Sequence, residues 1–131
     1  MKVYNIDDDQ ISNFLNERIL EEAGLASDIR SFLSAEDVLA YMQQDCEENL
    51  PDIIFLDLNM PMMNGWEFLD ILMQHKNVLK DKCHIYILTS SLDISDTARS
   101  KEYDLVSGFI HKPLKLEDVQ LILSEIEDQA G

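Results

Sequence analysis

Four short apolar segments of the chain each end in polar residues that suit phosphate chemistry. The segments and the residues that follow them are Val3–Ile6 with Asp7 and Asp8, 53–56 with Asp57, 85–88 with Thr89, and 108–110 with Lys112. If these segments are parallel strands of one sheet, their carboxyl ends lie at one edge, where open α/β folds bind ligands. We therefore expect three carboxylates, one hydroxyl and one amine to share a small site.

The charge of this site predicts a metal ion. Asp7, Asp8 and Asp57 carry three negative charges and Lys112 one positive charge, which leaves −2 when all are ionised. Carboxylates crowded together raise one another's pKa values unless a cation lies between them. Mg²⁺ suits the site best, because it takes one or two carboxylates plus phosphate oxygens and keeps several waters. We expect Mg²⁺, with Mn²⁺ as a substitute ion and the backbone carbonyl of Asn59 as a further ligand.

Such a site accepts a phosphoryl group well. Asp57 is the best candidate nucleophile, since it ends the most apolar segment and a carboxylate can form an acyl phosphate. The metal and Lys112 would stabilise the equatorial phosphoryl oxygens, and the Thr89 hydroxyl could donate to a third oxygen. In the segment that follows, Met60-Pro61 redirects the chain and Gly65 is expected to adopt a positive φ before a helix.

The elements that position these residues alternate along the chain. Strands are predicted at Val3–Ile6, 29–33, 53–56, 85–88 and 107–110, and amphipathic helices follow each of them. Asp9 is expected to cap the first helix and Gly24 to end it. The segments 45–51 and 76–82 are predicted to be a loop and a polar connection, and 95–103 a weak helix with few apolar residues. The layout is (βα)₅ with a parallel sheet and helices on both faces.

Composition excludes several classes of protein. The chain has 131 residues, enough for one domain with a real core, and its net charge of −16 repels nucleic acid and anionic membranes. No apolar segment is long enough to cross a bilayer, and no secretory signal opens the chain. Cys46 and Cys83 show no metal-binding spacing, so we expect two reduced thiols in a cytoplasmic protein.

In their order along the chain, the motifs resemble the receiver domain of two-component response regulators, over residues 2–127. They are Asp7-Asp8, Asp57-x-x-Met60-Pro61-x-x-x-Gly65, Thr89-Ser90 and Lys112-Pro113. The resemblance implies a flavodoxin-like three-layer sandwich with a five-stranded parallel sheet of order 2-1-3-4-5. No GxGxxG motif opens the first helix, which makes a dinucleotide- or flavin-binding protein a poor alternative.

The resemblance also implies a role for each residue of the site. Asp57 resembles the phospho-accepting aspartate, Asp8 the direct Mg²⁺ ligand, Asp7 the acid that holds metal-bound water, and the Asn59 carbonyl the third protein ligand. Thr89 resembles the switch hydroxyl, Lys112 the lysine that pairs with the phosphoryl group, and Lys112-Pro113 the family's cis peptide. Phe109 occupies the position of the aromatic switch, with a simple core or edge aromatic as the alternative. Asn59 and Ser91 stand where the family tunes the lifetime of the acyl phosphate.

These roles predict a signalling switch that receives a phosphoryl group from a histidine kinase or a histidine-phosphotransfer protein. Because the sequence stops at Gly131, we expect one receiver domain over residues 1–131 with no output domain, which signals through a protein target. The donor should dock on Ile11, Phe14 and Leu15 and on the Pro113-Leu114 loop, although core packing is the competing explanation for Leu15 and Ile11. The surface of the fourth helix, fifth strand and fifth helix should change on phosphorylation.

Two other functions would use the same residues. A phosphatase of the aspartyl-phosphate type needs Asp-x-Asp at its nucleophile, and Asp57-Leu58-Asn59 lacks the second acid. We therefore expect a phosphoacceptor and not an enzyme with a turnover substrate. A phosphorylation-independent adaptor on the same fold is the alternative, but it would be free to lose the site residues that this chain keeps.

Overall fold

The computed structural model describes residues 1–25, 28–44, 50–80, 82–90 and 94–130. The predictions made for Cys46, for Ser91 and for most of the loop at 45–51 lie outside these residues. Strands and helices alternate along the described chain. They are β1 (Val3–Ile6), α1 (Gln10–Glu22), β2 (Ile29–Phe32), α2 (Ala35–Gln44), β3 (Ile53–Asp57), α3 (Gly65–Met73), α4 (Lys76–Leu79), β4 (His84–Thr89), α5 (Ile94–Ser100), β5 (Val106–His111) and α6 (Leu116–Ala130).

The five strands form one parallel sheet in the order β2-β1-β3-β4-β5, as predicted. Val3 of β1 lies opposite Ile29 of β2 and Ile53 of β3, so the three strands start level with one another. Their carboxyl ends are therefore level too. Asp7 and Asp57, which follow or end β1 and β3, stand side by side at the middle of the sheet edge.

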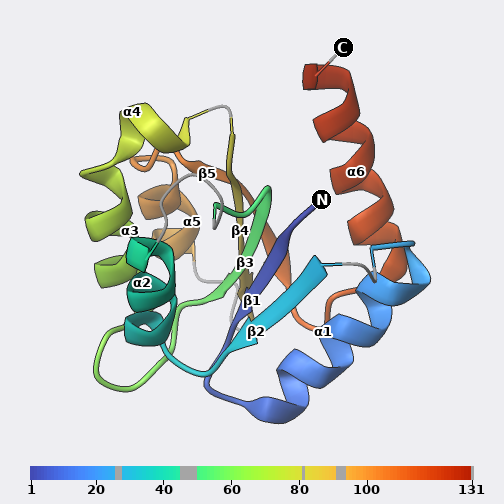
Figure 1. The fold of residues 1–131 in the computed structure, drawn as a ribbon, viewed down its shortest axis with the longest axis horizontal. Coiled ribbons are helices and arrows are strands. Elements are labelled where there is room, and N and C mark those ends of the chain that lie inside the picture. Colours follow the sequence, from blue (N-terminus) through green and yellow to red (C-terminus); the bar gives the residue numbers. More distant parts are fainter. Residues whose placement is uncertain (26–27, 45–49, 81, 91–93, 131) are drawn as a thin grey trace.

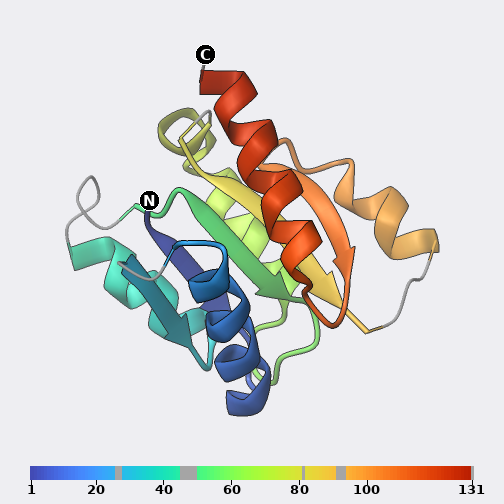
Figure 2. The ribbon, with the colours of Figure 1, turned by 90° about the vertical axis from the view of Figure 1, so that its right-hand side faces the viewer.

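Helices cover both faces of the sheet, which gives the flavodoxin-like three-layer sandwich (Figure 1). α1 and α6 lie together on one face, and α2, α3 and α5 lie on the other; Figure 2 looks onto the α1 and α6 side. Each face has its own apolar core, because side chains of a strand alternate between the faces. All five residues of β3 are buried, as expected of a central strand covered on both sides.

α1 presents a different face to the sheet from the one its apolar residues suggest. Its buried side chains are Asn13, Asn16 and Leu20, whereas Ile11, Phe14 and Leu15 are 69%, 56% and 53% exposed. The core-packing explanation for Leu15 and Ile11 is therefore wrong. The reason is polar: the Asn13 side-chain Nδ2 donates to the backbone carbonyls of Asp7 at 3.0 Å and Phe32 at 3.3 Å, and these bonds turn its side of the helix inward.

The connection at 76–82 is more ordered than the polar connection predicted for it. α4 forms one helical turn there, in which the Lys80 N–H donates to the Lys76 carbonyl at 2.8 Å. Leu79 is 2% exposed and anchors this turn in the core that α2 and α3 share. The buried Leu79 side chain therefore helps to hold this turn against the apolar core.

The helices of the described chain are short in comparison with the thickness of a bilayer. α6 has 15 residues, and a transmembrane helix needs about 20. No helix in the described part of the chain is both long and apolar enough to cross a membrane.

Candidate functional site

The strand ends bring the predicted acidic residues together. Asp7, Asp8 and Asp57 each offer a carboxylate oxygen, and these oxygens all lie within 4.8 Å of one another. Asp7 and Asp57 are buried, with 3% and 7% of their surface exposed, whereas Asp8 is exposed. Two of the carboxylates are thus buried and one is exposed to solvent. A site that both holds charge and admits a ligand requires this arrangement.

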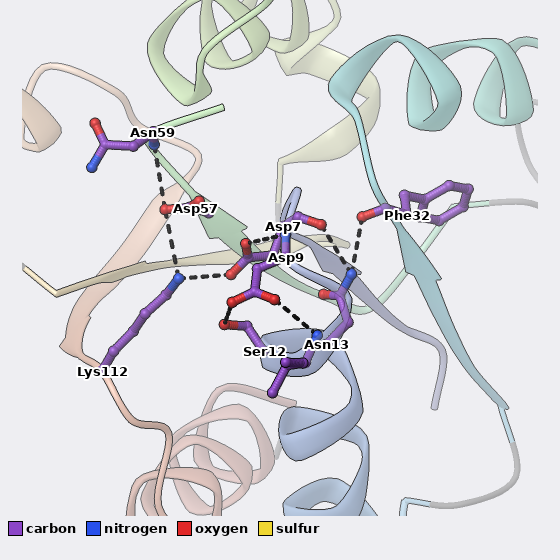
Figure 3. Close-up of polar contacts among 9 residues, drawn as sticks. Asp7, Asp9, Ser12, Asn13, Phe32, Asp57, Asn59 and Lys112 are labelled. Carbon is purple, nitrogen blue, oxygen red and sulfur yellow. Dashed lines mark hydrogen bonds and ion pairs between the residues drawn. The ribbon is translucent and has the colours of Figure 1, made fainter. Parts of the chain in front are cut away.

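Lys112 directly follows the carboxyl end of β5, and its side chain reaches this cluster (Figure 3). Its Nζ donates to Asp7 Oδ2 at 2.6 Å and lies 3.7 Å from Asp57 Oδ1. The Lys112 backbone N–H donates to the Thr89 carbonyl at 2.7 Å, and the Lys112–Pro113 peptide bond is cis, as predicted. The single amine of the site therefore lies between two carboxylates, closer to Asp7 than to Asp57.

Asp7 is fixed by the start of α1. Its Oδ1 accepts the Asp9 N–H at 3.0 Å while Oδ2 accepts Lys112, so both oxygens are engaged. Asp9 is the N-cap of α1, as predicted, because its side chain accepts the Ile11 N–H at 2.9 Å. Figure 3 shows these bonds and those of Asn13 converging on the loop between β1 and α1. This loop is held rigidly at the edge of the site.

The electrostatics of the site follow from burial and from the neighbouring charges. Burial and the negative charge of Asp7 raise the pKa of Asp57 from 3.8 to about 6, against the opposing influence of Lys112. Burial alone would lower the pKa of Lys112, but its hydrogen bond to Asp7 and the charge of Asp57 outweigh burial and raise it. Lys112 therefore stays positive at neutral pH. Ionisation of Asp57 lowers the stability of the folded protein, because its pKa is raised.

The segment between β3 and α3 is tightly turned. The Asn59 N–H donates to Asp57 Oδ1 at 3.3 Å, and the Asn59 carboxamide points away from the carboxylates (Figure 3). The positive φ predicted for Gly65 is wrong, since it is Met62 that has a φ of 70°. Gly65 is needed for space instead, because a Cβ there would lie 2.8 Å from the carbonyl oxygen of Asp57. The Gly65 N–H donates to the Leu58 carbonyl at 3.0 Å.

The two predicted switch residues lie on the neighbouring strands. Thr89 is the last residue of β4 and is 1% exposed, one residue beyond the position paired with Asp57. Phe109 lies in β5 opposite Ile87 and is half-buried against the core on the α2 and α3 side. Its ring is therefore neither fully inside nor free in solvent, and its role as a switch stays a prediction.

The donor set of the site fits a hard divalent cation. All three acidic ligands are carboxylates, which are the donors that Mg²⁺ prefers. An octahedral ion with bonds of about 2.0–2.1 Å needs its ligand oxygens roughly 3–4 Å apart, close to the spacing of the three carboxylates. Asp7, Asp8 and Asp57 can therefore converge on one such ion with small side-chain movements.

Comparison with known proteins places the chain in a family. The family model of the response regulator receiver domain matches residues 3–124. The chain belongs to this family. Receiver domains bind Mg²⁺ at an acidic site of the kind formed here by Asp7, Asp8 and Asp57.

Similar receiver domains are found in larger proteins and in structures of about this size. The chain is 33% identical to hybrid signal transduction histidine kinase C of Dictyostelium discoideum, over 97% of the chain but only 10% of that protein. A two component response regulator from Cytophaga hutchinsonii has a TM-score of 0.89 and 33% identity, over 97% of this chain and 96% of that one. The Vibrio cholerae chemotaxis protein CheY4 has a TM-score of 0.75 and 25% identity, over 95% and 97%.

One residue that shapes this receiver site, Asn13, was not predicted from the sequence. Asn13 fixes the loop that carries Asp7 and Asp8, yet in the sequence it is one polar residue among several at the start of α1. Its spacing offered a signal: Asn13, Asn16 and Leu20 recur at i, i+3 and i+7, as a buried helical face does.

Proposed function

We propose that this receiver domain accepts a phosphoryl group on Asp57 from a phosphohistidine donor and signals through a surface that changes as a result. The observation that supports this most directly is the position of Asp57, which is buried beside two other carboxylates and one lysine. A buried carboxylate with a raised pKa, in a set that fits Mg²⁺, is a candidate functional group by physical criteria.

In the proposed reaction one oxygen of Asp57 attacks the phosphorus atom of the donor. A bond forms between that oxygen and phosphorus, the bond from phosphorus to the imidazole nitrogen breaks, and the imidazole leaves with its electron pair. Lys112 lies 3.7 Å from the attacking carboxylate and is placed to stabilise the negative phosphoryl oxygens. A bound Mg²⁺ would supply further positive charge for the same oxygens. The domain itself is a phosphoacceptor and turns over no separate substrate.

The new phosphoryl group would change the contacts of Lys112. At present the lysine is 2.6 Å from Asp7 and 3.7 Å from Asp57, so it favours Asp7. Three additional anionic oxygens on Asp57 would draw Lys112 toward that side, because they offer more negative charge than a single carboxylate. The Thr89 hydroxyl would donate to the same group, and Phe109 would turn inward behind it. These two movements are the proposed switch.

The donor protein would dock beside the site on α1. An exposed apolar patch on α1 is formed by Ile11, Phe14 and Leu15. Exposed apolar patches of this kind usually mark contact surfaces. Leu15 also lines a groove of about 300 Å³ that runs between α1 and the loop after β5, and the other lining residues include Lys112, Pro113 and Leu114. A helix of a histidine kinase or a histidine-phosphotransfer protein would lie along this groove, beside Lys112 of the site.

The output would pass through the surface formed by α5, β5 and α6. We propose a single receiver domain over residues 1–131 that acts on a protein target, in the cytoplasm and without contact to nucleic acid. The net charge of −16 supports this assignment, since it disfavours both DNA and anionic membranes. A phosphorylation-independent adaptor remains the alternative function.

Labelling with a small phosphodonor tests the proposal. The wild-type domain should incorporate one phosphoryl group per chain in the presence of Mg²⁺ and none when EDTA is present during the reaction. Asp57→Asn should abolish labelling, while the control Asp37→Asn, which changes an exposed acid in the first turn of α2, should leave it intact. Full labelling of the Asp57→Asn variant would remove Asp57 as the acceptor, and no labelling of the wild type would favour the adaptor.

A further inference from the structure

α5 has little buried surface to hold it on the sheet. Among the α5 side chains that the structure describes, those of residues 95–100, only Ser100 is buried, and its hydroxyl donates within the helix to the Thr97 carbonyl at 2.7 Å. α2, α3 and α6 all contribute apolar side chains to the two cores, whereas these α5 residues contribute none. Over residues 95–100, contacts other than apolar burial must therefore hold α5 in place.

Four side chains provide such contacts between α5 and α3, which cover the same face of the sheet (Figure 1). The Arg99 guanidinium lies over the Trp66 ring, 4.6 Å from its centroid. Tyr103, in the segment after α5, stacks on Trp66 with the ring centroids 5.6 Å apart and 28° between the planes. The Tyr103 hydroxyl donates to Asp70 of α3 at 2.7 Å. Trp66, Asp70, Arg99 and Tyr103 are called the α3–α5 clamp below.

The α3 side of the clamp is joined tightly to the site. Trp66 follows Gly65, whose N–H donates to the Leu58 carbonyl and whose Cα is packed against the Asp57 backbone so closely that no Cβ fits. Asn64 and Glu67 form a capping box that fixes the first turn of α3. Trp66 is itself only 8% exposed. The start of α3 is therefore a rigid base, fixed to the end of β3 that carries Asp57.

The α5 side of the clamp comes after Thr89, the predicted switch residue, in the sequence. α5 begins at Ile94, five residues after Thr89, so it is the first helix along the chain that the proposed movement of Thr89 toward Asp57 would reach. The clamp opposes that movement, because it ties Arg99 and Tyr103 to the fixed base at Trp66. The start of α5 therefore comes shortly after Thr89 in the sequence, whereas its end is held by Trp66 of α3.

We propose that the α3–α5 clamp is a conformational restraint that holds α5 in its present position and thereby opposes the change that phosphorylation of Asp57 produces. The second half of this statement rests on the proposed function. Weakening the clamp lowers the free energy needed to move α5, so it favours the phosphorylated arrangement without touching Asp57, Lys112 or the metal ligands. The strength of the clamp sets how readily the domain switches.

The first test measures the restraint in the absence of any phosphoryl group. Arg99→Ala removes the cation over Trp66, and Lys101→Ala removes an exposed cation in the turn after α5, outside the clamp. We expect hydrogen exchange of the amides at 98–100, which have acceptors within α5, to be about two- to five-fold faster in Arg99→Ala than in Lys101→Ala, the factor for losing an exposed cation–π contact. Equal exchange in the two variants would overturn the proposal.

The second test measures the coupling to the site, with beryllium fluoride in Mg²⁺ as the phosphoryl mimic. Arg99→Ala should bind the mimic about two- to five-fold more tightly than the wild type and Lys101→Ala. Tyr103→Phe, which keeps the stacked ring but loses the hydrogen bond to Asp70, should shift the affinity in the same direction. Unchanged affinity in both clamp variants would refute the coupling. Failure of the wild type to bind the mimic would refute the proposed function, and the exchange result would still decide the restraint.

Discussion

Replacing Asp57 by asparagine should stabilise the metal-free domain at neutral pH. The wild-type carboxylate is buried next to Asp7, and Lys112 compensates its charge only at 3.7 Å while bonding Asp7 more closely. Asparagine has almost the same shape, keeps an oxygen that can accept the Asn59 N–H, and carries no charge. The variant therefore removes repulsion and desolvation without opening a cavity.

The size of this effect follows from the pKa of Asp57. The folded protein raises this pKa from 3.8 to about 6, and one pKa unit corresponds to about 1.4 kcal/mol, which sets an upper limit of about 3 kcal/mol. Screening by solvent at the open side of the site reduces the expected gain to about 1–2 kcal/mol. The pKa of Asp57 is higher in the folded protein than in the unfolded chain. Below pH 3.8 the carboxyl group is neutral in both states and does not lower the free energy of unfolding. The wild type then loses stability as the pH rises through about 6.

Urea denaturation in EDTA between pH 4 and pH 8 measures this difference. The free energy of unfolding of Asp57→Asn should match that of the wild type near pH 4 and exceed it increasingly up to about pH 7, whereas the control Asp37→Asn should show no such trend. Added Mg²⁺ should reverse the order, because the wild-type carboxylate binds the ion and the amide binds it poorly. A variant that is less stable than the wild type at pH 8 in EDTA would refute the reasoning.

Three further substitutions test other parts of the structure by the same denaturation assay. Lys112→Ala should cost about 3 kcal/mol at neutral pH, because Asp7 and Asp57 lose their shared cation; an unchanged stability would contradict this role. Gly65→Ala should cost about 1–3 kcal/mol, since its Cβ would meet the Asp57 carbonyl at 2.8 Å; a neutral result would mean the loop yields easily. Asp9→Ala should cost about 1 kcal/mol by removing the cap of α1, and an effect below about 0.3 kcal/mol would show that the cap is replaceable.

The sequence predicted the sheet and the position of its polar ends well. Parallel strands bring their carboxyl ends to one edge whatever the loops do, so the strand pattern alone predicted Asp7, Asp57 and Lys112 at the same edge of the sheet. The cap at Asp9 was predictable for a similar reason, because it depends on a local contact of the helix start. The order of the strands came from the resemblance to the family and not from the pattern.

What the sequence could not predict depends on contacts between distant segments. The buried side of α1 was set by hydrogen bonds from Asn13 to two strand ends, against the helix's apolar residues. The need for glycine at Gly65 arose from the approach of another backbone segment and not from its own φ. The stacking of Trp66 with Tyr103 joins residues far apart in the chain. Only the buried side of α1 leaves a local signal, in the spacing of Asn13, Asn16 and Leu20; the approach of the backbone to Gly65 and the stacking on Trp66 leave none.

We propose that Asp57 itself carries the phosphoryl group, and this can be tested directly. Borohydride reduces an aspartyl phosphate to homoserine and so marks the acceptor permanently, and peptide mass spectrometry then locates it. After reaction of the wild-type domain with a small phosphodonor in Mg²⁺, we predict homoserine at position 57 and unmodified Asp7 and Asp8. Homoserine at either of those two residues, or at no residue of a fully labelled sample, would contradict the account.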